Sequence, residues 1–191
     1  MTIMYSAVVL VLSICVAIVY SERDPDCSPH QFHEDRKCCS DIPMLFPDSN
    51  HKSIMETCGM RGKGKGPGPG PGPGPGGDPE EADCAAECVL KAHKLITDDG
   101  HLDSDAFTAL AKSSFTDSWA TVGVEAVQKC IQTAASDVDA NSKCKSGAHH
   151  MMHCVKKQMF LSCPEAHWTA TPECQSAKTR MEKCEPPKRH P

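Results

Sequence analysis

Cysteine spacing constrains this chain more than any other feature of its sequence. Thirteen cysteines occur in 191 residues, a density typical of disulfide-bonded proteins in an oxidising compartment. Most of them follow one pattern, Cys84-x3-Cys88-x41-Cys130-x13-Cys144-x9-Cys154-x8-Cys163-Pro164-x9-Cys174. The chain must therefore fold so that these positions meet in pairs, and the other segments are attached to that frame.

The N-terminus predicts a signal peptide over residues 1–21. These residues have no charged side chain, and an almost unbroken apolar run extends from Ala7 to Val19. The run is shorter than the roughly 20 residues that span a bilayer, but it suits the central region of a signal peptide. Cleavage after Ser21 would remove Cys15 and leave an even number of cysteines, enough for six disulfides. We expect a secreted, extracellular product with no membrane insertion after cleavage; the alternative is an uncleaved signal anchor.

Composition divides the rest of the chain into four segments. Residues 22–59 form a proline-interrupted N-terminal arm with four cysteines and one apolar group at 42–46, which we expect to be pinned onto a core elsewhere. Residues 60–79 are a Gly/Pro/Lys insertion in which glycine recurs every second residue, so a collagen triple helix is excluded and a solvated linker is favoured. Residues 80–164 predict a helical core, and residues 165–191 form a cysteine-containing C-terminal extension.

Apolar periodicity predicts an all-α fold. A proline and two acidic residues at 79–81 suit a helix N-terminus, and Thr97 to Gly100 end that helix. We expect further helices at four places, namely one capped by Asp103 or Ser104, one capped by Asp117 or Ser118, one over Lys143–Leu161 and one over Glu173–Cys184. The third has the clearest 3.6-residue stripe, which consists of Ala148, Met151, Met152, Val155 and Met159.

Cys84 and Cys88 define the expected hub of the fold. At positions i and i+4 of a helix the Cβ atoms lie about 5–6 Å apart, whereas a disulfide needs about 3.5–4.5 Å. The two cysteines should therefore pair with different segments and not with each other. Adjacent Cys38 and Cys39 should likewise reach different segments. Spacing alone does not choose among the many remaining connectivities.

His149, His150 and His153 are the main candidates for polar chemistry. Histidines at i and i+4 can share a metal ion, and histidines that titrate in mild acid can act as a pH sensor. However, these three lie with Lys156 and Lys157 on the face opposite the methionine stripe. We therefore favour a solvated helix face, and we expect neither a metal nor a cofactor.

Sequence motifs for catalysis or nucleic-acid binding do not occur. The chain has no Gly-x-Ser-x-Gly, His-Glu-x-x-His or Walker motif. The double cysteine at 38–39 is followed by Ser40-Asp41-Ile42-Pro43 and not by the His-Asp pair of secreted phospholipases. A net charge of −5 gives no reason to expect nucleic acid. We expect a binding protein and not an enzyme.

The methionine and aromatic residues say more about function than the histidines do. Pliant methionines tolerate varied apolar ligands in a cavity, although such residues can equally be ordinary core. The expected lining residues are Phe107, Leu110, Phe115, Trp119, Val122, Met151, Met152, Val155, Met159 and Phe160. Because both tyrosines lie within residues 1–21, we expect any polar anchor to be Ser, Thr, His, Lys or backbone.

Several spacings occur together in this chain. They are Cys84-x3-Cys88, the long gap to Cys130, Cys144-x9-Cys154, Cys154-x8-Cys163, Cys163-Pro164-x9-Cys174, and Cys38-Cys39 with a following Ile-Pro-x-Leu-Phe. In combination they resemble the Plus-C subclass of insect odorant-binding proteins, over most of the mature chain. The sequence departs from that pattern in a shorter Cys130–Cys144 gap and in the Gly-Pro insertion.

The resemblance implies a compact, disulfide-stapled bundle of about six or more short helices around an apolar cavity. It implies the bridges Cys58–Cys88, Cys84–Cys154 and Cys130–Cys163. Three further bridges would join six cysteines whose partners stay unassigned, namely Cys27, Cys38, Cys39, Cys144, Cys174 and Cys184.

The function that the resemblance implies is binding and transport of small hydrophobic molecules, odorants or related semiochemicals, in sensillar lymph or another body fluid. A second copy of the chain and a chemosensory receptor are further partners to consider. The alternative is a disulfide-rich secreted interaction or defence protein, such as a protease inhibitor or an antimicrobial. Helical periodicity argues against the inhibitor, and the negative net charge argues against the antimicrobial.

Overall fold

Residues 37–47, 50–60, 79–134, 136, 138 and 141–183 are described by a computed structural model of the protein. The elements are α3 (His51–Thr57), α4 (Pro79–Ala92), α5 (Ser104–Ser114), the 3-10 turn η3 (Asp117–Trp119), α6 (Ala120–Ala134), α7 (Ala148–Leu161), the 3-10 turn η4 (Glu165–His167) and α8 (Pro172–Lys183). Within these residues, extended pairing is limited to the isolated bridges Cys39–Trp168 and Ile96–Leu102. The predicted all-α class is confirmed. The predicted signal peptide, most of the insertion, Cys27 and Cys184 lie outside the described residues.

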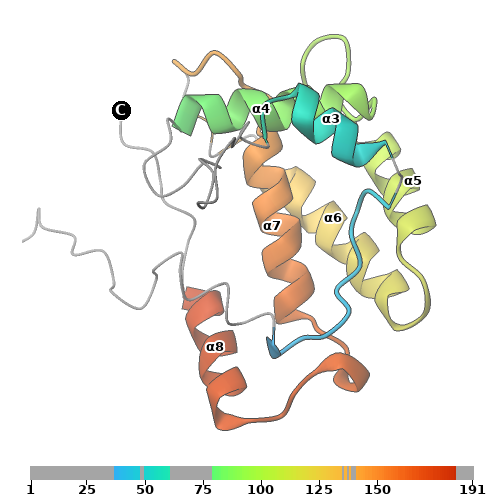
Figure 1. The fold of residues 1–191 in the computed structure, drawn as a ribbon, viewed down its shortest axis with the longest axis vertical. Helices are drawn as coiled ribbons and strands as arrows, with labels where there is room; N and C mark the ends of the chain where they lie inside the picture. The colour runs from blue at the N-terminus through green and yellow to red at the C-terminus, as the bar shows by residue number, and fades with distance from the viewer. Residues whose placement is uncertain are drawn as a thin grey trace, which may run out of the picture.

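The helices are arranged around α7, which runs through the middle of the molecule (Figure 1). α6 packs alongside it, α4 lies across its N-terminal end, and α8 packs near its C-terminal end. α5 covers the far side of α6, and α3 lies against α4. Residues 37–47 run from the end of α7 towards α5 and α3, so the N-terminal arm crosses the bundle. None of the described helices is long and apolar enough to cross a bilayer.

Most helix boundaries follow from local sequence signals. The Asp103 side chain accepts a hydrogen bond of 2.9 Å from the backbone N–H of Ala106 and so caps α5. Glu80 and Glu81 occupy the first turn of α4, where the helix dipole favours negative charge. α7 ends at Leu161, before Pro164, because proline cannot continue a helix.

The start of α7 differs from the prediction, since the helix begins at Ala148 and not near Lys143. The preceding segment bonds instead to α4. The backbone N–H of Lys143 donates to Glu80 Oε1 at 3.1 Å, and that of Ser146 donates to Glu87 Oε2 at 3.2 Å. Burial alone would raise the pKa of Glu87, but hydrogen bonds from Lys91 and Ser146 outweigh it and hold the pKa below its usual value. A carboxylate on α4 therefore fixes the approach to α7.

Five disulfides are present in the described residues, namely Cys38–Cys174, Cys39–Cys163, Cys58–Cys88, Cys84–Cys144 and Cys130–Cys154. Cys84 and Cys88 reach different segments, and so do Cys38 and Cys39, as their geometry required. The bridge Cys58–Cys88, implied by the resemblance, is also present.

Two implied bridges are wrong, namely Cys84–Cys154 and Cys130–Cys163. Cys154 lies within α7 and faces α6, the helix that carries Cys130. Cys144 lies in the segment that bonds to α4, beside Cys84. Cys163 follows α7, where the arm residue Cys39 meets it. The implied pairing thus placed two partners one cysteine too far along the chain.

Candidate functional site

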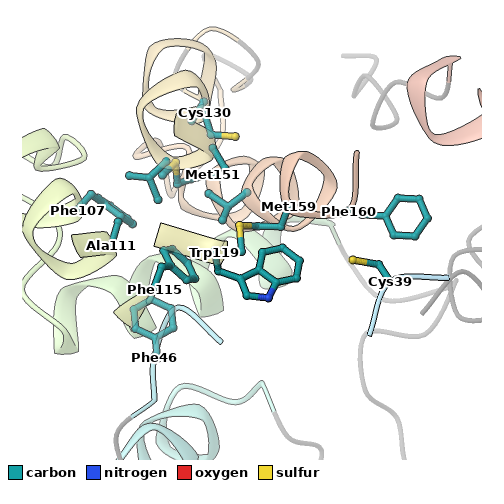
Figure 2. Close-up of a cluster of buried hydrophobic side chains, with 14 of the residues drawn as sticks. Cys39, Phe46, Phe107, Ala111, Phe115, Trp119, Cys130, Met151, Met159 and Phe160 are labelled. Atoms are coloured by element: carbon teal, nitrogen blue, oxygen red, sulfur yellow. The ribbon is translucent and has the colours of Figure 1, made fainter. Parts of the chain in front are cut away.

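All ten predicted lining residues lie in or against one buried apolar cluster. Seven are buried within it, namely Phe107, Phe115, Trp119, Met151, Val155, Met159 and Phe160. Leu110, Val122 and Met152 are partly buried and pack against it. Figure 2 shows the centre of this cluster, where side chains from α5, α6 and α7 converge. The structure therefore brings these residues together, and the binding of a ligand among them stays a prediction.

The N-terminal arm also contributes to the cluster. Phe46 is buried, and its ring stacks on His51 at 4.8 Å and on His93 at 4.4 Å between ring centroids. The backbone oxygen of Leu45 accepts a hydrogen bond of 2.9 Å from Ser114 Oγ at the end of α5. The sequence predicted that this apolar group is pinned to a core, but it did not identify Phe46 as part of the candidate site. Its place in the short apolar segment that follows the double cysteine is the signal that could have done so.

Close packing holds Phe115 in place against α6. A Cβ atom added to Gly123 would lie 2.0 Å from Phe115 Cδ2 and 2.3 Å from Phe115 Cγ. Such distances are far below a carbon–carbon contact of about 3.5–4.0 Å. Glycine at this position of α6 therefore lets the Phe115 ring lie directly on the helix backbone.

Trp119 carries a polar group that the fold leaves unsatisfied. The residue is 5% exposed, and its Nε1–H finds no hydrogen-bond acceptor among the described residues. An unsatisfied buried donor of this kind costs about 1–3 kcal/mol. The sequence-based set of possible polar anchors did not include an indole, because the burial of its N–H cannot be read from a one-dimensional pattern.

A polar group lies beside the indole of Trp119. The His167 ring lies 5.4 Å from the Trp119 ring. Its Nε2 lies 3.1 Å from Ser118 Oγ, and its Nδ1 lies 3.6 Å from Asp41 Oδ2. The order serine, histidine, aspartate matches that of a hydrolase triad, but a triad buries its carboxylate in a hydrogen bond to Nδ1. Asp41 is 79% exposed and beyond hydrogen-bond distance, so these contacts serve as a tether between η3, η4 and the arm.

The histidines of α7 do not form a uniformly solvated face. His149 packs against α4, where its Nδ1 lies 3.5 Å from Oδ1 of the buried Asp83. Burial, His153 and His150 together lower the pKa of His149 to about 4, and these effects outweigh the nearby carboxylate. His153 remains exposed. Within the part of the chain that the structure describes, no group of three or more His, Cys, Asp or Glu side chains is placed to hold a metal ion.

Comparison with known proteins identifies relatives that agree with the helical, disulfide-bonded fold. Residues 76–158, from just before α4 to most of α7, match the PBP/GOBP family. General odorant-binding protein 68 of Anopheles gambiae is 26% identical over 160 residues, which cover 78% of this chain and 68% of the relative. Odorant-binding protein 47 of the same species is 24% identical over 117 residues, which cover 53% of this chain and about half of the relative, 51%. The family match over residues 76–158, these relatives and the disulfide-stapled helical fold together support similarity of this chain to the insect odorant-binding proteins of the PBP/GOBP family.

Proposed function

We propose that this protein is a secreted carrier that binds small hydrophobic molecules, odorants or related semiochemicals, in an extracellular fluid. The observation that carries the proposal is the convergence of α5, α6, α7 and the N-terminal arm on one cluster of aromatic and methionine side chains. Ligand affinity would come mainly from the apolar area removed from water, at about 25 cal/mol per Å². Methionines such as Met151 and Met159 can repack around ligands of different shape.

The names of the relatives support the same function, because both are odorant-binding proteins. Membership in the Plus-C subclass is part of the proposal. The bridges Cys38–Cys174 and Cys39–Cys163, which tie the arm to the C-terminal extension, are consistent with that subclass. Five disulfides in the described residues also fit an oxidising, extracellular location.

Displacement of a fluorescent apolar probe, N-phenyl-1-naphthylamine, tests the proposal directly. The oxidised protein should take up the probe with a micromolar or lower Kd and release it to small apolar competitors. Reduced and alkylated protein should lose this binding, because the disulfides hold the bundle together. Absence of probe uptake by correctly oxidised protein would refute the carrier function.

A matched pair of methionine variants locates the binding. Met152 packs against the buried cluster, whereas Met44 is 70% exposed. Met152→Ala should weaken probe binding about three- to tenfold, since it removes apolar contact area, and Met44→Ala should leave the Kd unchanged. Equal effects of the two substitutions would place the probe elsewhere on the protein.

A further inference from the structure

The indole N–H of Trp119 has no structural role that the fold explains. Native proteins pair nearly all of their buried donors, yet this one is enclosed without an acceptor in the described part of the chain. His167, whose ring lies 5.4 Å from that of Trp119, has Ser118 Oγ 3.1 Å from Nε2 and Asp41 Oδ2 3.6 Å from Nδ1. Both His167 nitrogens thus face other groups, and no group in the described part of the chain accepts from the Trp119 donor.

We propose that Trp119 Nε1–H donates a hydrogen bond to an oxygen atom of the bound ligand. The ligands are then apolar molecules with one acceptor oxygen, such as ketones, aldehydes or esters, in preference to hydrocarbons. An indole N–H can only donate, so the ligand atom must be an acceptor. This inference rests on the proposed carrier function and specifies the class of molecule carried.

The surroundings of Trp119 favour such a bond. Met159 and Phe160, both buried, belong to the same cluster. Figure 2 shows the indole nitrogen on the edge of the ring turned away from Met159. His167, whose Nε2 contacts Ser118 Oγ, lies with its ring 5.4 Å from that of Trp119. A hydrogen bond made in such a low-dielectric interior is stronger than in water, and a site built around one discriminates against ligands that lack the acceptor.

The test replaces the N–H without changing the shape of the side chain. Trp168→Phe leaves Trp119 as the single tryptophan of the mature chain. In that background, a tryptophan-requiring host can supply benzothienylalanine, in which sulfur replaces the indole N–H, at position 119. Octane and 2-heptanone, which have equal numbers of non-hydrogen atoms, then compete for N-phenyl-1-naphthylamine on both proteins. The helical circular dichroism of the two proteins is compared first, to verify that both are folded.

We expect loss of the N–H to weaken 2-heptanone binding roughly three- to tenfold, the worth of one hydrogen bond, and to leave octane binding unchanged. With ¹⁵N-tryptophan in the Trp168→Phe protein, the single indole proton resonance should move downfield on addition of 2-heptanone and not of octane. Equal responses to both ligands, with an unmoved indole resonance, would overturn the inference while the carrier function stands. Failure of the Trp168→Phe protein and of the unsubstituted protein to bind the probe would overturn both.

Discussion

Gly123→Ala offers the sharpest test of how the core is packed. In most helices this change stabilises the protein by about 1 kcal/mol, because alanine has the higher helix propensity. Here the new methyl group would lie 2.0 Å from Phe115 Cδ2 and 2.7 Å from Phe115 Cε2. The sign of the effect therefore depends on whether the Phe115 ring can move.

The magnitude follows from the distances. To reach a normal carbon–carbon separation of about 3.5 Å, the ring must withdraw by about 1.5 Å. Phe115 is 2% exposed and surrounded by other buried side chains, so such a displacement is at the costly end of overpacking, about 3 kcal/mol. After the propensity gain, we expect Gly123→Ala to lower the free energy of unfolding by about 2 kcal/mol.

Urea unfolding of the disulfide-intact protein at pH 7, followed by circular dichroism, measures this change. Thr121→Ala, at an exposed position of the same helix, is the matched control and should be neutral or slightly stabilising. In a Phe115→Ala background the clashing Cγ and Cδ2 atoms are absent, and Gly123→Ala should then cost little or nothing. A single variant Gly123→Ala as stable as the unsubstituted protein, or an undiminished cost in the Phe115→Ala background, would refute the packing argument.

Three further predictions address charge, capping and covalent structure. The pKa of His149 is lowered from 6.5 to about 4 in the folded state, so the side chain takes up a proton on unfolding below pH 6.5. The full pKa shift would lower the free energy of unfolding by about 2 kcal/mol between pH 7 and pH 5. Because 28% of the side chain is exposed, we expect only about half of this effect, so His149→Gln should remove about 1 kcal/mol of the acid destabilisation. Urea unfolding at pH 7 and pH 5 measures it, and an unchanged pH dependence of stability would contradict the assignment. Asp103→Ala should cost about 1 kcal/mol in the same assay and Asp103→Asn almost nothing, because asparagine also caps; equal losses would argue against the cap. Joint replacement of Cys84 and Cys144 by serine should cost up to about 4 kcal/mol, from the 60-residue separation that the bridge closes. This variant should show no more dye-reactive thiol than the unsubstituted protein, whereas Cys84→Ser with Cys154→Ser should expose two more, and additional thiol in the first variant would contradict the pairing.

Local signals in the sequence predicted most of the helices, although α4 ends at Ala92 and not at Thr97–Gly100 as expected. Asp103 or Ser104 was expected as a cap and Asp103 is the one found, Pro164 was expected as a stop, and the methionine stripe of residues 148–159 is buried except for the partly buried Met152. These features depend on neighbours within one or two turns of the chain, so a pattern of a few residues determines them. The start of α7 was placed too early because Glu80 and Glu87, which hold the preceding segment, are distant in sequence.

Features that depend on how the helices pack could not be predicted from the sequence. Which of Cys144, Cys154 and Cys163 meets Cys84 is decided by the position of α7 relative to α4 and α6. His149 belongs to a helix face that looks solvated in a helical projection, but α4 covers part of that face and places Asp83 beside it. The unsatisfied N–H of Trp119 is likewise a property of its surroundings.

The disulfides have a consequence for the covalent integrity of the chain. Cys38–Cys174, Cys39–Cys163 and Cys58–Cys88 each join a residue before the 61–78 segment to a residue after it. A proteolytic cut anywhere within 61–78 would therefore release nothing, since the two fragments remain linked three times over. The nicked protein should migrate as one species in a non-reducing gel and separate into two only on reduction. Continuity of the peptide backbone in the Gly-Pro run is thus redundant for keeping the molecule in one piece, which leaves that stretch free to vary in length and sequence.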